Sequence, residues 1–334
     1  MEYYNKVIDN GVFDDKIIDN ENNYKIINNR VIDDKVIDNE GNFKIIDNDA
    51  IENEGIEKEI KNSEVFNDMK HILTSELRTK LLISLFSSKK ELKFIRKDLD
   101  KPSTSILHGI KQLKKLNLIK KEESIYGLSS KGMILAANIL KLIENTFSIN
   151  NNCDFWKHHT IDDIPQKFLK KIHHIHNARQ VSSENGVCTE NSNEYLELIS
   201  KSRKIKIVTP IFFDIHLDMV INNLNSNESL ELITTEEILD FMRINGHGYK
   251  LISLKEDLDI KIWKFPRDFK LFLTSCDNFS SLSLFSNEHY DDSSMLLDES
   301  KIGIKWGLGL FEYYKENSEL IDIEKYFDIY EGHE

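Results

Sequence analysis

Polar side chains that can read nucleic-acid bases gather at the start of the stretch STSILHGIKQLKK, residues 103–115. Four short or ring-bearing residues come first, and a lysine follows nearly one helical turn later: Ser103, Thr104, Ser105, His108 and Lys111. Hydroxyl and imidazole groups donate and accept hydrogen bonds, so in the first turns of a helix they can approach base edges in the major groove of DNA. We therefore predict that these residues contact double-stranded DNA.

Basic side chains surround this stretch, although the chain as a whole is acidic. The formal net charge is −13, and residues 1–60 hold sixteen Asp or Glu against seven Lys or Arg, whereas residues 89–121 hold eleven Lys or Arg against three Asp or Glu. A basic block in an acidic chain indicates one surface suited to a polyanion. The side chains that we expect to contact phosphates are Lys89, Lys90, Arg96, Lys97, Lys101, Lys114, Lys115, Lys120 and Lys121.

Five histidines within nineteen residues raise the question of metal binding: His158, His159, His173, His174 and His176. Neutral imidazoles coordinate zinc, nickel or copper. No Cys-x-x-Cys or acidic partner motif accompanies them, and the three cysteines, Cys153, Cys188 and Cys276, lack the paired spacing of a zinc site or a disulfide framework. We predict no metal site, and a metal-responsive regulator that uses the 158–176 cluster stays open as an alternative.

Motifs for catalysis are absent from the sequence. It contains no Gly-rich phosphate loop, no Gly-x-Ser-x-Gly elbow and no paired His-Glu metal helix. The segment HGYK at residues 247–250 differs from the His-x-Lys motif of phospholipase D-like enzymes and lacks the aspartate that completes it. We therefore predict no catalytic residues, no cofactor and no enzymatic activity.

The elements that position the polar stretch follow from hydrophobic spacing. Apolar residues recur every three or four positions in residues 66–86, in a shorter helix at 89–100 and in a third helix after Pro102, where Ser103 and Thr104 are expected to cap the helix start. Alternating residues from Leu118 predict a hairpin, and helical spacing returns over residues 129–149. Three helices, a hairpin and a long helix make a winged helix-turn-helix at residues 65–148, whose third helix enters the major groove.

Two other interpretations of the basic block stay open. Lys and Arg on a short helical bundle can serve only to solvate it. A winged helix can also bind a protein instead of DNA, which would make the chain a protein-interaction adaptor.

The second half of the chain predicts an α/β domain. Residues 200–285 alternate segments typical of strands and of helices, from KIKIVTP to FSSLSLFS, which indicates an open sheet covered by helices. Ligands of such sheets bind beyond the carboxyl ends of strands, here near Thr209-Pro210 and Thr234-Thr235.

The N-terminal segment repeats the motifs KVIDN and KIIDN with a larger period of nineteen residues, which is a duplication signature. Residues 1–60 are expected to form either short β-hairpins or a disordered tail. No apolar run approaches the roughly 20 residues that cross a bilayer, and the N-terminus lacks the form of a secretory signal, so we expect a cytoplasmic protein without a membrane partner.

The motifs STSILHGIKQLKKLNLI and GLSSKG, followed by FWKHHTIDDIPQKFLKKI and WGLGLFEYYKENS, resemble a family of archaeal, chiefly methanogen, transcriptional regulators. The likeness covers residues 65–317. It implies a winged helix-turn-helix followed by a methanogenesis-regulatory, or filament-regulator-type, effector domain at residues 150–317. That domain would have a mixed, phospholipase D-like sheet without the catalytic motif. Residues 318–334 lie beyond the likeness and are expected to form an acidic tail.

From the residues and the resemblance together we predict an α+β, multidomain chain that acts as a sequence-specific DNA-binding regulator. It is expected to be a homodimer, because two copies match two DNA half-sites, and a small-molecule signal of unknown identity is expected to act at the α/β domain. The long helix after the hairpin is the expected domain connector and a candidate dimer surface.

Overall fold

The computed structural model describes residues 31–32, 35–37, 43–45, 65–182, 193–212, 229–254 and 259–327. The chain forms two compact units, Met1–Phe66 and Asn67–Glu334, each described by itself below. Within these described ranges, no helix is long and apolar enough to cross a membrane.

Three short strands are described in the first unit: β1 (Val31–Ile32), β2 (Lys35–Ile37) and β3 (Phe43–Ile45). They pair antiparallel in the order β1-β2-β3. Short hairpins were one of the two predictions for residues 1–60. The rest of the repeat lies outside the described residues.

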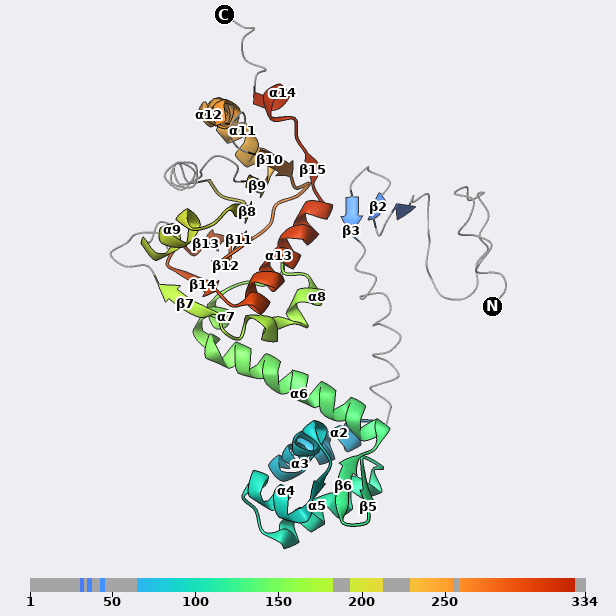
Figure 1. The fold of residues 1–334 in the computed structure, drawn as a ribbon. Coiled ribbons are helices and arrows are strands. Elements are labelled where there is room, and N and C mark those ends of the chain that lie inside the picture. Colours follow the sequence, from blue (N-terminus) through green and yellow to red (C-terminus); the bar gives the residue numbers. More distant parts are fainter. Residues whose placement is uncertain are drawn as a thin grey trace, which may run out of the picture. The chain divides into compact units, whose positions relative to one another are not determined.

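The second unit begins with a small helical module. Its elements are α2 (Val65–Leu73), α3 (Glu76–Ser87), β4 (Lys90–Glu91), α4 (Leu92–Leu99), α5 (Ser103–Lys115), β5 (Ile119–Glu122), β6 (Ile125–Leu128) and α6 (Ser130–Asn151). The strands β5 and β6 form the predicted hairpin, and β4 adds to β6 to give the order β4-β6-β5. The predicted sequence of helices, hairpin and long helix is confirmed, and the winged helix-turn-helix is visible at the bottom of Figure 1.

Two local predictions for this module were wrong. Residues 66–86 form two helices instead of one, because Ser75 caps a new helix by accepting a hydrogen bond from the amide of Arg78. The apolar spacing runs through the break, which hid it. At α5 the N-cap residue is Pro102, with no side-chain cap, so Ser103 and Thr104 lie inside the helix and do not cap it.

Close packing in this module depends on two glycines. A Cβ atom on Gly109 would lie 2.8 Å from Cδ1 of Leu81, so α5 lies unusually close to α3. A Cβ atom on Gly132 would lie 2.0 Å from the carbonyl oxygen of Leu118, which brings the start of α6 against the backbone ahead of the hairpin.

The remainder of the second unit is a sheet domain. Its helices are α7 (Cys153–His158), α8 (Gln166–Leu169), η2 (Ile172–Ile175), α9 (Asn193–Ser200), α11 (Glu236–Ile244), α12 (His247–Leu254), α13 (Lys301–Glu316) and α14 (Ile323–Phe327). Its strands are β7 (Arg179–Ser182), β8 (Lys204–Val208), β9 (Ser229–Thr234), β10 (Asp259–Lys264), β11 (Leu271–Cys276), β12 (Ser280–Ser286), β13 (His289–Tyr290), β14 (Ser294–Asp298) and β15 (Glu319–Leu320).

The sheet is mixed, as predicted. Its order is β15-β10-β9-β8-β11-β12-β14-β7, with β13 paired to β12. Strands β8, β9 and β10 are parallel to one another, and β11 joins β8 antiparallel. The likeness to phospholipase D-like sheets stays a prediction.

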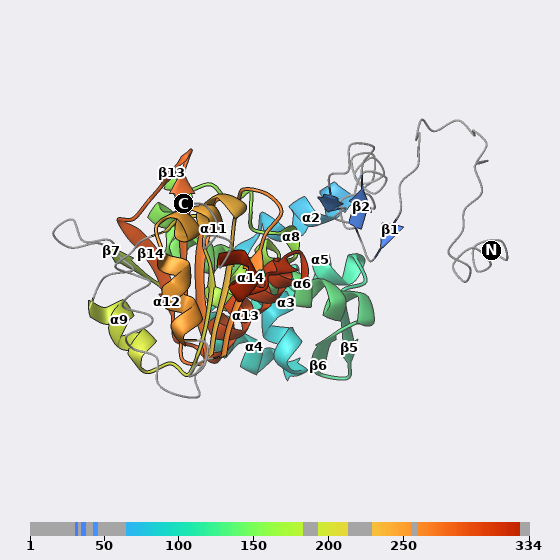
Figure 2. The ribbon, with the colours of Figure 1, turned by 90° about the horizontal axis from the view of Figure 1, so that it is seen from above.

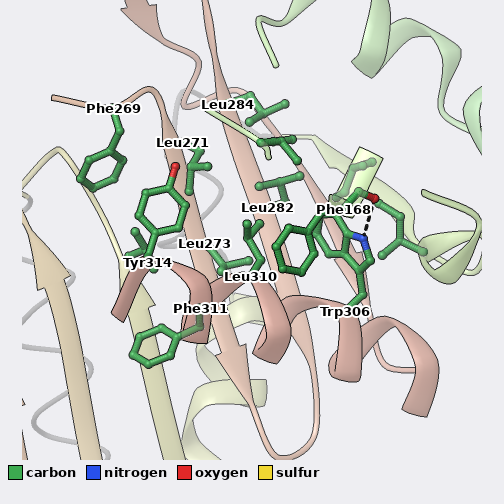
Figure 3. Packing of buried hydrophobic residues seen from close by; sticks show 14 of the residues in the cluster. Phe168, Phe269, Leu271, Leu273, Leu282, Leu284, Trp306, Leu310, Phe311 and Tyr314 are labelled. Carbon is green, nitrogen blue, oxygen red and sulfur yellow. Dashed lines mark hydrogen bonds between the residues drawn. The ribbon is translucent and has the colours of Figure 1, made fainter. Parts of the chain in front are cut away.

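Two apolar cores cover the two faces of this sheet. One contains α9, α11, α12 and α14, and the other contains α13 with α7, α8 and η2 (Figures 1 and 2). Figure 3 shows the second core, where Trp306 of α13 donates a hydrogen bond to the carbonyl oxygen of Phe168 over 3.2 Å. Side chains of α13 alternate with those of β11 and β12 in this layer.

The segment predicted as an acidic tail, residues 318–334, contributes to the sheet domain in its described part. Strand β15 pairs antiparallel with β10, and α14 buries Ile323 and Phe327 in the first core. Ile321 and Tyr326 pack against the same core, so the apolar side chains of this acidic segment fix it to the sheet domain.

Candidate nucleic-acid interface

Helix α5 has one buried and one outward face. The residues that pack into the module core are Ile106, Gly109, Ile110 and Leu113. The residues directly opposite are Thr104, His108, Lys111 and Lys115, all exposed, at spacings of four, three and four. We call these four residues the outward stripe of α5. The buried face anchors the helix, so the stripe is held toward solvent.

Other predicted base-reading and phosphate residues border this stripe. Ser105 and Lys114 are exposed on either side of it, and Ser103 is half-buried at the helix start. Because no side chain caps α5, the hydroxyls of Ser103 and Thr104 are not consumed by capping. The first-turn amides and these hydroxyls therefore share one end of the helix.

One residue of the stripe is held by a chain of hydrogen bonds. Nε2 of Gln112 lies 2.9 Å from Nε2 of His108, and Oε1 of Gln112 accepts a hydrogen bond from Nη1 of Arg78 over 2.7 Å. Neither Gln112 nor Arg78 was singled out from the sequence. The spacing of four between His108 and Gln112 was the available signal, since residues four apart on a helix are neighbours.

The predicted phosphate-contacting lysines fall into two groups. Three of them pair with carboxylates: Lys89 and Lys120 with Glu122, at 2.9 and 3.0 Å, and Lys90 with Asp98 at 2.5 Å. Within the described ranges no ion pair involves the other five, Lys97, Lys101, Lys114, Lys115 and Lys121, nor Lys111 of the outward stripe. All six of these side chains are exposed.

The hairpin is less cationic than its lysines suggest. Hydrogen bonds from Lys89 and Lys120 lower the pKa of Glu122 to about 2, so this carboxylate stays ionised and offsets both charges. Glu123, with a positive φ of 54°, lies at the exposed tip beside it. Five of the six unpaired lysines therefore lie on α4, α5 and the turn between them, and the sixth, Lys121, lies on β5.

Two protein-family models match this chain. The model of the N-terminal domain of methanogenesis regulatory protein FilR1 matches residues 66–146, and the model of its middle domain matches residues 189–317. Together they span more than half of the chain. The chain belongs to the FilR1 family. This confirms the resemblance found in the sequence.

A curated FilR1 from Methanothrix harundinacea (strain 6Ac) is 25% identical over 258 residues. The match spans 76% of this chain and 58% of that relative. Among solved structures, TrmBL2, an archaeal chromatin protein with a novel mode of DNA binding, is 13% identical, with a TM-score of 0.33, covering 76% of this chain and 99% of its own. IdeR from T. acidophilum is 16% identical, with a TM-score of 0.21, covering 66% of this chain and 97% of its own.

In this FilR1-family chain, His159 of the histidine cluster is part of the packed sheet domain. His159 is almost fully buried, with its Nδ1 2.6 Å from the carbonyl oxygen of Phe155 and its Nε2 2.9 Å from Asp291. Burial raises the pKa of Asp291, but hydrogen bonds from Ser293 and His159 outweigh it and hold the pKa below its ordinary value. Among the residues that the structure describes, no three His, Cys, Asp or Glu side chains could hold one metal ion.

Three further histidines of the cluster, His173, His174 and His176, lie where α6 meets η2. Oδ1 of Asn145 on α6 accepts hydrogen bonds from the backbone amide and from Nδ1 of His173, at 3.0 and 2.7 Å. The ring of His174 stacks edge-on against that of His173. Partial burial lowers the pKa of His174, and the neighbouring His173 and Lys171 lower it further. These rings join the connector helix to the sheet domain.

The threonines at the strand ends are also engaged within the protein. Oγ1 of Thr234 donates to the carbonyl oxygen of Thr209 over 2.6 Å, and Oγ1 of Thr209 donates to that of Ile211 over 2.7 Å. Thr235 caps α11 by accepting from the amide of Ile238. The position expected for a ligand is therefore stabilised by internal hydrogen bonds, and which residues would bind a signal stays open.

Proposed function

We propose that this FilR1-family chain is a homodimeric, sequence-specific DNA-binding regulator of transcription. The observation that carries the proposal is the outward stripe of α5, which presents a hydroxyl and an imidazole near the helix start and two unpaired lysines further along. In a helix-turn-helix the start of the second helix meets base edges, while flanking cations meet phosphates. The regulatory family agrees with a role other than catalysis.

Thr104, His108 and Lys111, with Ser103 and Ser105 beside them, are the proposed base-reading residues. Lys97 and Lys101 precede α5, and Lys114 and Lys115 end it, so they would flank the groove and contact phosphates. The paired state of Lys120 gives it a smaller expected share, because a phosphate would have to compete with Glu122.

Dimer formation is proposed through the second half of α6. Leu142, Ile143 and Phe147 are exposed by 49%, 41% and 57%. Asn145 and Ser148 lie on the other side of this helix, where Asn145 binds His173 of the sheet domain. A second copy that covers this apolar stripe would place two α5 helices on one duplex, as two half-sites require.

A signal at the sheet domain would reach α6 through its bonds to the region of η2. Besides Asn145, Asn152 donates a hydrogen bond to the carbonyl oxygen of Ala178 over 3.1 Å. A signal molecule that favours one arrangement of these contacts would change the geometry of the proposed dimer.

Fluorescence anisotropy with labelled promoter duplexes tests DNA binding. The affinity of the full chain should fall by roughly 0.9 log units per phosphate contact for each log unit of salt. Lys111→Ala combined with Lys115→Ala should weaken binding to every duplex. It should also reduce the salt dependence of the affinity by the share of about two phosphate contacts. Lys80→Ala is the matched control, since Lys80 lies on α3 in an exposed pair with Glu76.

Two outcomes would oppose the proposal. A flat salt response, or no binding at low salt, would favour the protein-interaction adaptor. Equal effects of the α5 variant and the Lys80 control would place the duplex elsewhere on the chain.

A further inference from the structure

The hydrogen-bond chain behind α5 determines which nitrogen of His108 carries the proton. A guanidinium has only donors, so the atom of Gln112 that faces Arg78 must be its amide oxygen. The amide nitrogen of Gln112 then faces Nε2 of His108, 2.9 Å away. An amide nitrogen can only donate, so Nε2 of His108 must accept and carries no proton. In a neutral ring the proton is therefore on Nδ1.

The two residues that fix the proton on Nδ1 of His108 are less exposed to solvent than His108 itself. Arg78 on α3 and Gln112 on the flank of α5 are half-buried, while His108 is exposed on the outward stripe. In the part of the chain that the structure describes, Nδ1 of His108 has no hydrogen-bond partner. The ring thus presents a single free polar group to solvent, an N–H donor.

We propose that Arg78 and Gln112 are positioning residues that make His108 a fixed donor, which reads a hydrogen-bond acceptor on the major-groove edge of DNA. This inference rests on the proposed DNA-binding function and adds the class of base edge that is read. The acceptors available there are N7 of either purine, O6 of guanine and O4 of thymine, whereas cytosine offers only an amino donor. His108 should therefore discriminate against cytosine at the position it meets.

Without the hydrogen bonds of Arg78 and Gln112, His108 would discriminate less strongly against cytosine. A neutral histidine that is free to exchange its proton between Nδ1 and Nε2 can either donate or accept. It could then also take a hydrogen bond from the amino group of cytosine. The hydrogen bonds among Arg78, Gln112 and His108 would thus convert an ambiguous side chain into a selective one.

Nitrogen-15 NMR of the full chain, labelled at histidine, shows without DNA which ring nitrogen of His108 carries the proton. The His108 signals, assigned by their loss in His108→Ala, should show a protonated Nδ1 and an unprotonated Nε2 at pH 8. Gln112→Met, which keeps the length of the side chain but removes the amide, should give a mixture of the two forms. A wild-type ring protonated on Nε2 would overturn the inference.

Selection from randomised duplexes tests the readout. Gln112→Met should discriminate against cytosine at one position about threefold to tenfold less strongly than the wild type. The dependence of its affinity on salt should stay that of the wild type. Lys115→Gln is the matched control on the same helix and should weaken binding to all duplexes alike. Wild-type chain that binds DNA with a steep salt slope, but selects the same sequences as Gln112→Met, would contradict the inference while leaving the proposed function intact. Absence of any DNA binding would remove both.

Discussion

At the scale of residues, two networks of polar side chains join different elements and have different consequences. The network of Arg78, Gln112 and His108 ends at an exposed ring, so it fixes a side chain that a partner molecule can contact. In the network around Glu231, both oxygens of this carboxylate accept from lysines, Lys206 and Lys315, each at 2.5 Å, and Lys206 also pairs with Glu312. The first network suits recognition and the second suits stability.

Glu231→Gln should destabilise the sheet domain in a pH-dependent way. Burial raises the pKa of Glu231, but the hydrogen bonds and charges of Lys206 and Lys315 outweigh it and lower the pKa. A carboxylate whose pKa is lowered by folding stabilises the native state above its unfolded pKa of about 4.3, and this contribution is lost as pH falls through the folded value. We expect a loss of about 3 kcal/mol in the free energy of unfolding at pH 7.

Urea unfolding at pH 7 and at acidic pH measures this effect. The difference between wild type and Glu231→Gln should shrink as the pH falls below about 4. Glu197→Gln is the control, since Glu197 forms only an exposed pair with Lys201. A difference that stays constant with pH would show that the carboxylate charge is not what stabilises the domain.

At the scale of elements, the sequence was informative wherever apolar spacing decides the structure. The helices α4, α5 and α6, the hairpin and strands β8 to β12 follow from periodicity and turn residues alone. The split at Ser75 did not, because the apolar repeat continues across it. The pairing of β15 and the packing of α14 depend on contacts between distant parts of the chain, which no local pattern reports.

The same limit applied to the candidate site. Its exposed lysines and short polar residues are visible in the composition, whereas Arg78 is thirty-four residues from Gln112 in sequence. The neutralisation of Lys89 and Lys120 by Glu122 also required the hairpin geometry. Sequence could therefore indicate the kind of surface, and the structure shows which of its charges are unpaired.

Gly132→Ala should loosen the junction between the hairpin and α6. The new methyl group would meet the carbonyl oxygen of Leu118, which is backbone and cannot rotate away. Overpacking costs about 1–3 kcal/mol, and the gain in helix propensity offsets about 1 kcal/mol of it. We expect a net loss of about 1–2 kcal/mol. Circular dichroism during thermal unfolding measures it.

Asn138→Ala on the exposed side of α6 is the control for this change, because its side chain bonds only the carbonyl oxygen of Ile134 within the same helix. Its unfolding midpoint should stay close to that of the wild type. If Gly132→Ala proved as stable as Asn138→Ala, the close approach at Leu118 would not be a constraint on the fold.

At the scale of the whole molecule, the proposal gives helix α6 two roles. The helix would connect the DNA-binding module to the regulatory sheet domain and form the dimer surface. The hydrogen-bonded contacts of α6 with the η2 region, and its exposed apolar stripe, are the features that make this possible. The strength of such a dimer depends on how much apolar surface a second copy covers.

Phe147→Asp should convert the dimer to monomer. A charge in the middle of an apolar interface is costly to desolvate, and Phe147 is exposed in the single chain, so its replacement should leave the fold intact. Sedimentation equilibrium should show a dimer for the wild type and a monomer for the variant. Lys141→Asp, one of the polar positions on the same helix, is the control, and a wild-type monomer at all concentrations would contradict this part of the proposal.

The most direct test of the central claim is lysine footprinting of the full chain with and without duplex DNA. Acetylation read out by mass spectrometry should show Lys97, Lys101, Lys111, Lys114 and Lys115 protected by DNA. The paired Lys80 on α3 and the exposed Lys305 on α13 should react equally in both states. If DNA left the α5 lysines as reactive as before, or protected all lysines to the same extent, the outward stripe would not be the DNA-binding surface.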